Sequence, residues 1–281
     1  MIKLLDQKYK ERVHEFLLKR NIILSDLDKY IDNMDDYIYI SEENENINGY
    51  ALCHIENDVL KINNYNFNNV NDFINTIRFI IFNTKNDIEI IGNESIKDIL
   101  QEFGFLYDEQ NSKYSRKFQK IVSNNIKIIN LFDQDDNTKK KLLEQLQEPF
   151  WIGAKHLYEN IINGNQGGKI FMMYDYDQDH IICFETLHDF DEIESETLKP
   201  WIGSIYTFRP YRGNRYSEQL INYILCEAKE EGNEFVYLSS NNEGMYQKYG
   251  FELIDMMKTV RGNTTQVFMY DTKKLGNNKT I

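Results

Sequence analysis

Hydrophobic and polar positions in the second half of the chain follow two periods. Short apolar runs rich in Ile, Phe and Tyr predict strands, and apolar residues that recur every three or four positions predict amphipathic helices. The strands are expected at 126–131, 169–175, 180–187, 201–208, 235–239, 252–260 and 265–271. The helices are expected at about 137–147, 151–163, 215–231 and 244–249.

The same order of elements recurs in the first half. Strands are expected there at 1–4, 37–41, 50–55, 59–63 and 87–91, and helices at about 8–18, 25–34, 70–82 and 95–103. A polar stretch at 119–125 separates the halves, so we expect two domains, 1–120 and 121–281. Hairpins give antiparallel neighbours and helical crossovers give parallel ones. Each domain is therefore predicted to be an α+β fold, with a mixed, mostly antiparallel sheet flanked by helices.

The junction between the strand at 201–208 and the next helix carries the strongest chemical signal. The first N–H groups of a helix have no partner within the helix, and the helix dipole favours an anion beside them. Gly213 lets the backbone approach a ligand, and Arg209, Arg212 and Arg215 add positive charge around it. The pattern predicts a phosphate site. The alternative is that these arginines are solvated loop charges that balance an acidic protein.

A second segment, Gly244–Phe251, follows the strand expected at 235–239. In this order and context, the two segments together resemble those of the GNAT superfamily of N-acetyltransferases. In that family an Arg/Gln-x-x-Gly-x-Gly/Ala turn holds the pyrophosphate of acetyl-coenzyme A, and a later Tyr-x-x-x-Gly-Phe segment places a tyrosine beside the coenzyme sulfur. Tyr246, Gly250 and Phe251 match the second segment residue for residue.

The turn itself departs from the family pattern at two positions. Arg212 stands at the family's Arg/Gln, whereas Arg215 and Ser217 replace the first glycine and the second small residue. Each replacement adds a Cβ, although Arg215 could compensate by pairing with a phosphate. The resemblance implies that the pyrophosphate is held by Arg212, Gly213, Asn214, Arg215, Tyr216 and Ser217. It also implies that the pantetheine arm pairs with the backbone at Tyr206, Thr207 and Phe208, where ordinary sheet pairing is the alternative.

The resemblance also implies a general acid and a general base. Tyr246 is the expected acid, because a phenol with a pKa near about 10 can protonate a leaving thiolate of similar basicity. The alternative is that Tyr246 is one of many packing tyrosines. The strand at 201–208 carries no acidic residue, so the candidates for the base are Glu185, His188, Asp189 and Asp191. His188 and Asp189 are the expected pair, and a water relay is the alternative.

The first half resembles a degenerate second copy of this domain. The sequence at 102–105 is similar to that at 248–251, but Leu100 stands at the position of Tyr246. The segment expected to match the phosphate turn, 63–69, has neither Gly nor Arg. We therefore expect a GNAT-like domain without a coenzyme site. The alternative is an unrelated α+β cap domain.

Composition narrows the classes of partner. The 281 residues carry a net charge of −13, which disfavours nucleic acid and suits a cationic small substrate, although acidity can also serve solubility alone. Three widely spaced cysteines without a C-x-x-C pair favour a reducing cytoplasm and argue against a metal site. The lack of a bilayer-length apolar run or a leader-like N-terminus predicts a cytoplasmic protein without a membrane partner.

The sequence thus predicts an acetyl-CoA-dependent N-acetyltransferase without a metal. It would move the acetyl group directly to a primary amine of a small, cationic acceptor. The alternative function is that of a catalytically inactive GNAT-like protein with a binding or regulatory role.

Overall fold

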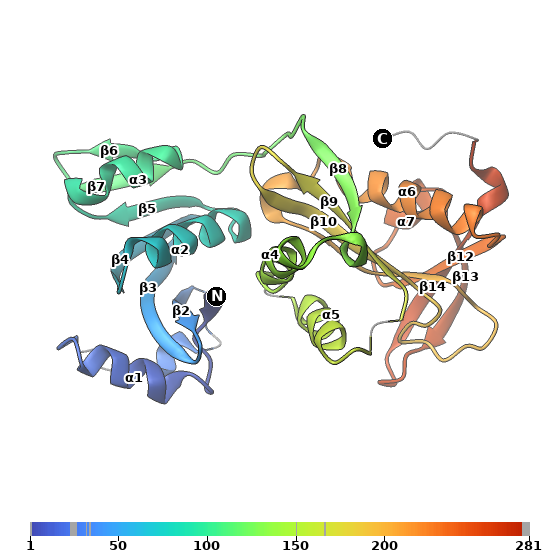
Figure 1. Ribbon diagram of the computed structural model, residues 1–281, viewed down its shortest axis with the longest axis horizontal. Helices are drawn as coiled ribbons and strands as arrows, with labels where there is room; N and C mark the ends of the chain where they lie inside the picture. Colours follow the sequence, from blue (N-terminus) through green and yellow to red (C-terminus); the bar gives the residue numbers. More distant parts are fainter. Residues whose placement is uncertain are drawn as a thin grey trace. The chain divides into compact units, whose positions relative to one another are not determined.

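The computed structural model describes residues 2–22, 27–31, 33, 35–149, 151–165 and 167–276 (Figure 1). The chain divides into two compact units, residues 1–120 and 121–281. Each unit is built on its own seven-stranded sheet.

The sheet of the first unit has the strand order β1-β2-β3-β4-β5-β7-β6. Only β4 and β5 pair in parallel, and all other neighbours are antiparallel. The strands are β1 (Ile2–Leu4), β2 (Asp36–Glu43), β3 (Asn46–Glu56), β4 (Val59–Phe67), β5 (Asp87–Ile91), β6 (Leu106–Asp108) and β7 (Lys113–Arg116). The helical segments are α1 (Lys10–Leu18), η1 (Asp28–Tyr30), α2 (Val70–Asn83), η2 (Glu94–Ile96) and α3 (Lys97–Glu102).

The sheet of the second unit has the order β8-β9-β10-β11-β12-β14-β13, and its one parallel pair is β11 with β12. The strands are β8 (Ile126–Asn130), β9 (Lys169–Asp175), β10 (His180–His188), β11 (Trp201–Thr207), β12 (Phe235–Ser240), β13 (Glu252–Lys258) and β14 (Thr264–Asp271). The helical segments are η3 (Leu131–Asp133), α4 (Asp136–Leu146), α5 (Ile152–Ile162), η4 (Arg209–Tyr211), α6 (Tyr216–Glu230), α7 (Met245–Lys248) and η5 (Thr272–Lys274).

The two units share one topology. Their strand orders correspond position by position, and the single parallel pair falls at the same place in both. A helix links the two parallel strands in each unit, α2 in the first and α6 in the second. The predicted fold class, two α+β units with mixed and mostly antiparallel sheets, is confirmed.

The correspondence extends to individual hydrogen bonds after α3 and α7. The N–H of Phe105 donates to the carbonyl of Leu100 at 3.0 Å, and the N–H of Phe251 donates to the carbonyl of Tyr246 at 3.1 Å. The glycine before each phenylalanine, Gly104 or Gly250, has a positive φ of 78° or 90°. Leu100 therefore occupies the backbone position of Tyr246, as the sequence comparison predicts.

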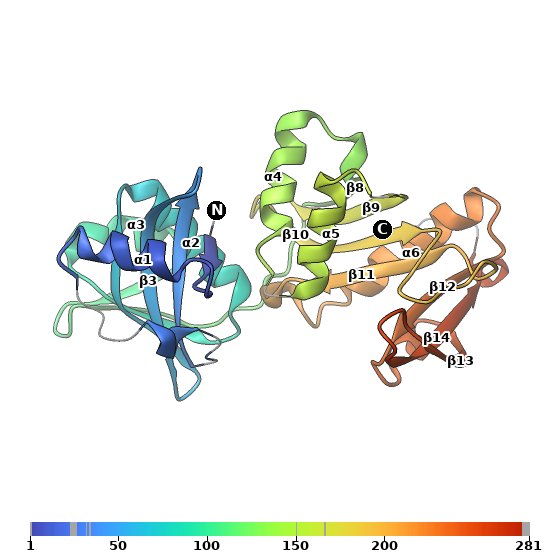
Figure 2. The same ribbon diagram turned by 90° about the horizontal axis from the view of Figure 1, so that it is seen from below.

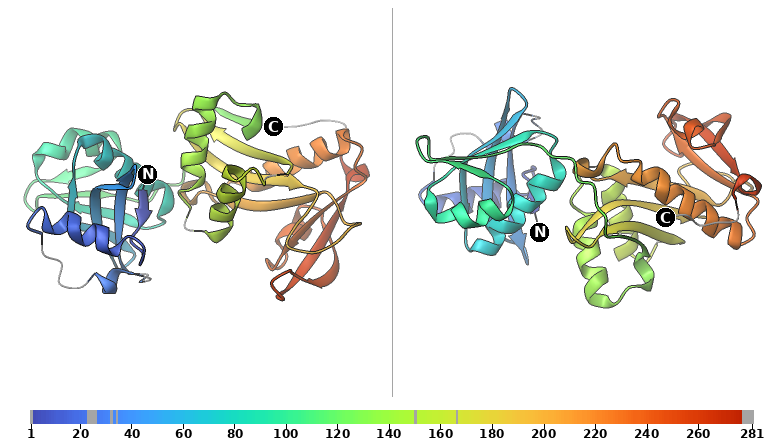
Figure 3. Two further views of the ribbon diagram at one scale, coloured as in Figure 1. Left: turned by 60° about the horizontal axis from the view of Figure 1, so that its bottom comes forward. Right: turned by 90° about the horizontal axis from the view of Figure 1, so that it is seen from above.

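Helices cover both faces of the second sheet. Helices α4 and α5 pack on one face and α6 packs on the other (Figures 2 and 3). The apolar side of α6 is buried at the predicted spacing, through Leu220, Ile221, Ile224, Leu225 and Ala228. The position of α6 is important for the site because its N-terminus follows β11 directly.

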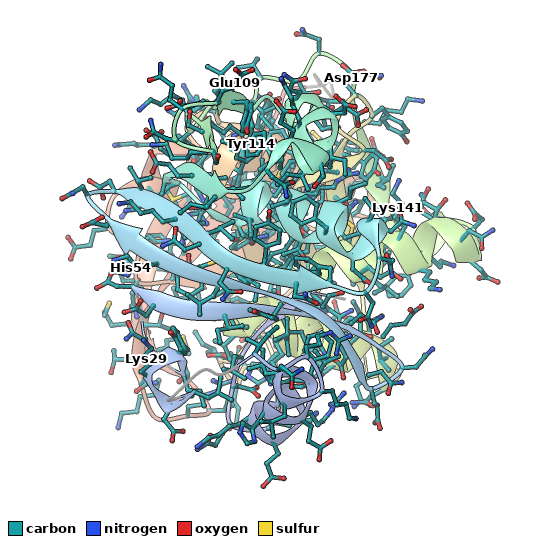
Figure 4. The ribbon with its side chains drawn as sticks, turned by 90° about the vertical axis from the view of Figure 1, so that its left-hand side faces the viewer. Lys29, His54, Glu109, Tyr114, Lys141 and Asp177 are labelled. Carbon is teal, nitrogen blue, oxygen red and sulfur yellow. The ribbon has the colours of Figure 1, made fainter. Side chains whose placement is uncertain are left out.

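The first sheet is likewise filled on both faces. One apolar cluster includes residues of α2, α3 and β7, and the other includes residues of α1, β2 and β3. Tyr114 of β7, labelled in Figure 4, is fully buried, and its hydroxyl donates to the carbonyl of Asn93 at 2.7 Å. The helices in the part of the chain that the structure describes include none that is long and apolar enough to cross a membrane.

Three features of the first unit differ from the sequence prediction. The helix expected at 25–34 includes residues outside the described set, and its described part contains only the short η1. Strands β6 and β7 were not expected, because they are short and polar. The expected loop at 63–69 is wrong: β4 continues to Phe67, since its backbone pairs with β3 and the rings of Tyr65 and Phe67 pack on Phe73.

The repeated glycine gives a matched test of the fold. Gly104→Ala should destabilise the protein by about 1–2 kcal/mol, the cost of a Cβ at positive φ. Gly250→Ala should cost at least about 1 kcal/mol more, because its Cβ would lie 3.0 Å from the ring of Tyr270. Urea unfolding followed by circular dichroism measures both. Equal losses would contradict the close packing at Gly250.

Candidate functional site

Strands β11 and β12 begin as neighbours and then separate. They pair at a single position, Trp201 with Tyr237, beside which the N–H of Tyr237 donates to the carbonyl of Pro200 at 2.9 Å. Figure 2 shows β12–β14 diverging from β11. Opposite Glu185 of β10, β11 carries a bulge in which Ser204 has a φ of 49°. A bulge bends its strand, and the described residues show no pairing of β11 with β12 beyond Trp201. This unpaired side of β11 is the candidate cleft for a ligand.

The alternation of the β10–β11 ladder decides which backbone groups face this cleft. The N–H of Phe208 donates to Ile182 of β10, so Tyr206, two residues earlier, also directs its backbone toward β10. The backbone of Thr207, between them, points into the cleft. Of the three predicted pantetheine partners, only Thr207 therefore offers its N–H to a ligand. The carbonyl of Phe208 already accepts the N–H of Tyr211 at 3.0 Å.

The turn after β11 is fixed by polar contacts on its inner side. The hydroxyl of Tyr211 donates to Asp175 Oδ2 at 3.0 Å, and both side chains are buried. Asn214 Nδ2 donates to the carbonyl of Ile121 at 2.8 Å. The N–H of Ser123 donates to the hydroxyl of Tyr216 at 3.0 Å. The side chains of Asn214 and Tyr216 therefore hold the turn, and only their backbone N–H groups are left for a phosphate.

The N-terminus of α6 is open. No side chain caps it, and it is preceded by two residues with positive φ, Gly213 at 86° and Arg215 at 60°. A 15-residue helix with an uncapped N-terminus is a favourable place for an anion. Arg215 adopts the left-handed conformation that favours glycine, which accounts for glycine at this position in the family pattern.

The two arginines nearest the turn differ in their contacts. Arg212 Nε donates to the carbonyl of Thr207 at 2.8 Å, and its guanidinium lies 5.3 Å from the ring centre of Tyr206. Arg212 is thus tied to the end of β11, at the mouth of the cleft. Arg215 is exposed and forms a two-point ion pair with Glu218, with Nη2 to Oε1 at 2.6 Å. Much of its charge is already balanced.

The side chain of Ser217, in the first turn of α6, points into the interior of the unit. Its hydroxyl donates to Glu185 Oε1 at 3.0 Å, and both side chains are buried. Burial raises the pKa of Glu185 well above its usual range, and the hydrogen bond from Ser217 lowers it only in part. The serine that replaces a small residue of the family pattern is therefore accommodated by a buried carboxyl group.

Tyr246 lies inside the unit rather than on its surface. Its side chain is 3% exposed and packs edge-on against Tyr249 and Phe251. Burial raises the pKa of Tyr246, and the side chains of Ser240 and Asn242 at the end of β12 lower it in part. The phenol is therefore protonated at neutral pH and able to donate a proton.

His188 and Asp189 lie elsewhere in the unit. His188 pairs with Trp201 at the start of β11, whereas the turn follows the end of that strand. Both residues line a cavity of about 270 Å³, together with Lys169 and Glu231. His188 Nδ1 is hydrogen-bonded to the carbonyl of Gly167, and burial lowers the pKa of the imidazole. The structure thus brings Glu185, Ser217 and Tyr246 together and places His188 and Asp189 at a separate cavity.

The sequence contained a signal for the link between Glu185 and Ser217 that periodicity alone did not reveal. Every residue of β10 is buried, so Glu185 is a carboxyl group within an otherwise buried strand. Such a group requires a polar partner nearby. The partner itself, Ser217, lies 32 positions away and emerges only from the packing of α6 on β10. Among the described residues, no group of His, Cys, Asp or Glu is arranged to hold a metal ion.

Comparison with known proteins agrees with this geometry. A family model described as an acetyltransferase (GNAT) domain matches residues 172–254. No curated protein matches the chain. The second unit therefore contains a GNAT domain, the fold of acetyl-CoA-dependent N-acetyltransferases, and the tandem GNAT-like arrangement predicted from the sequence is confirmed.

Solved structures of the same family are similar at low identity. A GNAT family N-acetyltransferase from Escherichia coli in complex with CoA is 18% identical, with 53% of this chain and 83% of that chain covered at a TM-score of 0.42. A GNAT family acetyltransferase from Elizabethkingia anophelis with acetyl-CoA bound is 17% identical, with 53% and 99% covered at a TM-score of 0.37. An acetyltransferase of the GNAT family from Staphylococcus aureus Mu50 is 17% identical, with 52% and 99% covered at a TM-score of 0.37.

The left-handed conformation of Arg215 gives a matched pair of variants. Arg215→Gly and Arg215→Ala both remove the ion pair with Glu218, but only alanine keeps a Cβ at positive φ. We expect the glycine variant to be more stable than the alanine variant by about 1 kcal/mol. Urea unfolding followed by tryptophan fluorescence suits this test, because both tryptophans lie in the second unit. Equal stability of the two variants would show that residue 215 can leave the left-handed conformation without a loss of stability.

Proposed function

We propose that the second unit binds acetyl-CoA along β11 and transfers the acetyl group directly to a primary amine of a small, cationic acceptor. The main support for this proposal is that two features occur together. The parallel strands β11 and β12 separate, and the uncapped N-terminus of α6 follows directly after β11. The cleft suits an extended arm that hydrogen-bonds to a strand, and the helix end suits a diphosphate.

The diphosphate would be held by backbone N–H groups between Arg212 and Ser217, with the guanidinium of Arg212 beside them. Thr207 would supply its N–H to the pantetheine arm. Acetyl-CoA brings the acyl group as a thioester. Tyr246, placed beyond the end of β12, would then give its proton to the sulfur as the carbon–sulfur bond breaks and the new carbon–nitrogen bond forms.

The base assignment of His188 and Asp189 stays a prediction. His188 suits the task chemically, because its lowered pKa leaves the imidazole neutral and able to accept a proton. His188 lies three positions along β10 from Glu185, which is opposite the bulge, a distance of about 10 Å along a strand. Proton transfer from an amine near the cleft would therefore need a water between the amine and His188.

The cationic character of the acceptor rests on charge. The chain carries a net charge of −13, and the cavity next to His188 is lined by Asp189 as well as by Glu231, whose charge is paired with that of Lys169. Negative charge around a cavity raises the local concentration of a cationic amine. The same reasoning disfavours an anionic acceptor.

We also propose that the first unit has no coenzyme site. The N-terminus of α2 is capped: Asn69 Oδ1 accepts the N–H of Asp72 at 3.0 Å, and the Asp72 carboxylate lies in the first turn. The cap already satisfies the N–H of Asp72, whereas α6 has no side-chain cap among the described residues. Beyond the β4–β5 pairing, the ring of Tyr65 stacks on Phe73 with centres 5.3 Å apart, so side chains fill the space.

Arg212 provides the test of coenzyme binding. Arg212→Ala should weaken acetyl-CoA affinity by about 1.5–3 kcal/mol, the range for losing a charge-assisted hydrogen bond. Calorimetric titration measures the affinity. Arg261→Ala is the control, because Arg261 is also an exposed arginine of the second unit but pairs with Glu192, away from the turn. Equal affinities for both variants and the wild type would favour solvated loop charges, and the absence of any acetyl-CoA binding would overturn the proposed function.

Tyr246 provides the test of catalysis. Tyr246→Phe should lower the turnover number by about 10²–10⁴-fold, with little change in acetyl-CoA affinity, because the packed ring is retained. Tyr249→Phe removes a neighbouring hydroxyl and should leave turnover within about threefold of wild type. Thiol release from acetyl-CoA across a panel of small amines measures both. Parallel losses of turnover and affinity would mark Tyr246 as structural, and coenzyme binding without turnover in the wild type would favour an inactive binding protein.

His188 is tested in the same assay. His188→Asn keeps a polar side chain but removes the base, so turnover should fall about 10²-fold with acetyl-CoA affinity unchanged. Unchanged turnover would assign proton removal to another group.

A further inference from the structure

Glu185 is a buried acid that the proposed chemistry does not use. Its side chain is fully buried on β10, directly opposite the bulge of β11. Oε1 accepts the hydroxyl of Ser217, whereas Oε2 has no hydrogen-bond partner among the described residues. A carboxyl group with one orphan oxygen in the interior of the unit needs a physical reason.

The surroundings of Glu185 contain acids and no cation. The titratable groups that interact with it are the thiol of Cys183, on its own strand, and the phenols of Tyr246 and Tyr249. From α6 it meets Ser217, and no described contact brings Lys, Arg or His to it. A buried carboxylate without a cation costs several kcal/mol, whereas the protonated acid leaves only one O–H without an acceptor.

We propose that Glu185 is a positioning residue of the acetyl-CoA site and works as an uncharged carboxylic acid that fixes Ser217 and the first turn of α6. This inference rests on the proposed function. Ser217 lies at the second residue of α6, so its side chain anchors the same turn whose N–H groups face outward to the diphosphate.

The uncharged form matters because of the helix dipole. The N-terminus of α6 carries a partial positive charge that favours one anion beside it. An ionised Glu185 would interact with this positive helix end from inside the unit, and its negative charge would repel the diphosphate. A neutral acid holds Ser217 by the same hydrogen bond and adds no second carboxylate to a turn that already carries Glu218, which is paired with Arg215. The role therefore differs from that of a general base, which must be ionised.

Four variants distinguish these roles in calorimetric and turnover assays. Glu185→Gln is the neutral isostere and should keep both acetyl-CoA affinity and turnover within about threefold of wild type. Glu185→Ala and Ser217→Ala remove the anchor and should raise the dissociation constant roughly tenfold, with a smaller effect on the turnover number. Thr186→Val is the control. It removes the unpartnered hydroxyl of the next residue on β10 and should change neither quantity.

An infrared difference spectrum of wild type minus Glu185→Gln at neutral pH provides an independent readout. We expect the carbonyl stretch of a protonated carboxylic acid, which an ionised general base would not produce. A carboxylate band, or a loss of turnover of about 10²-fold or more in Glu185→Gln at unchanged affinity, would overturn the proposal in favour of an ionised base. Wild-type affinity in both Glu185→Ala and Ser217→Ala would also overturn it. Failure of the wild type itself to bind acetyl-CoA would overturn the proposed function together with this inference.

Discussion

The separation of β11 from β12 is the constraint on which the proposed site depends. Parallel neighbours normally satisfy each other's backbone groups along their length, but here pairing is limited to Trp201 and Tyr237. The bulge at Ser204 bends β11 away, so among the described residues the N–H of Thr207 has no strand partner on that side, whereas its carbonyl accepts Arg212 Nε. Backbone groups left unpaired in this way need another partner, and an extended amide-bearing ligand supplies one. The turn and the uncapped end of α6 follow β11 directly, and Tyr246 follows the end of β12.

The two units show how the same topology can differ at the position of the proposed site. Each sheet contains one parallel pair at the same position, and the turns after α3 and α7 have equivalent hydrogen bonds. The difference lies in the helix that follows the central strand. Helix α6 begins without a side-chain cap after a long turn, whereas α2 begins two residues after β4 with Asn69 as its cap. A side-chain cap accepts a hydrogen bond from one of the first N–H groups of a helix. Without a cap, these N–H groups are available to a ligand.

Much of the fold was predictable because its elements have strong local patterns. The apolar spacing of α6 and the buried runs of β9–β11 set their positions to within a residue or two. The errors fell where long-range pairing decides the structure. The asparagine-rich end of β4 forms a strand only because β3 pairs with it, and the polar β6 and β7 have no local signal. In the site, the turn and Tyr246 followed from motifs. The contact between Glu185 and Ser217 did not, because it joins residues that only the packing of α6 brings together.

Amide hydrogen exchange of the full chain, with and without acetyl-CoA, tests the central claim most directly. The claim is that a ligand accepts hydrogen bonds from backbone N–H groups that β11 and the N-terminus of α6 leave without partners. The N-terminus of α2 already has its own side-chain acceptor. We predict slower exchange on adding acetyl-CoA across residues 207–217 and unchanged exchange across 68–72. Slower exchange at 68–72 alone, or at both helix N-termini equally, would contradict the account.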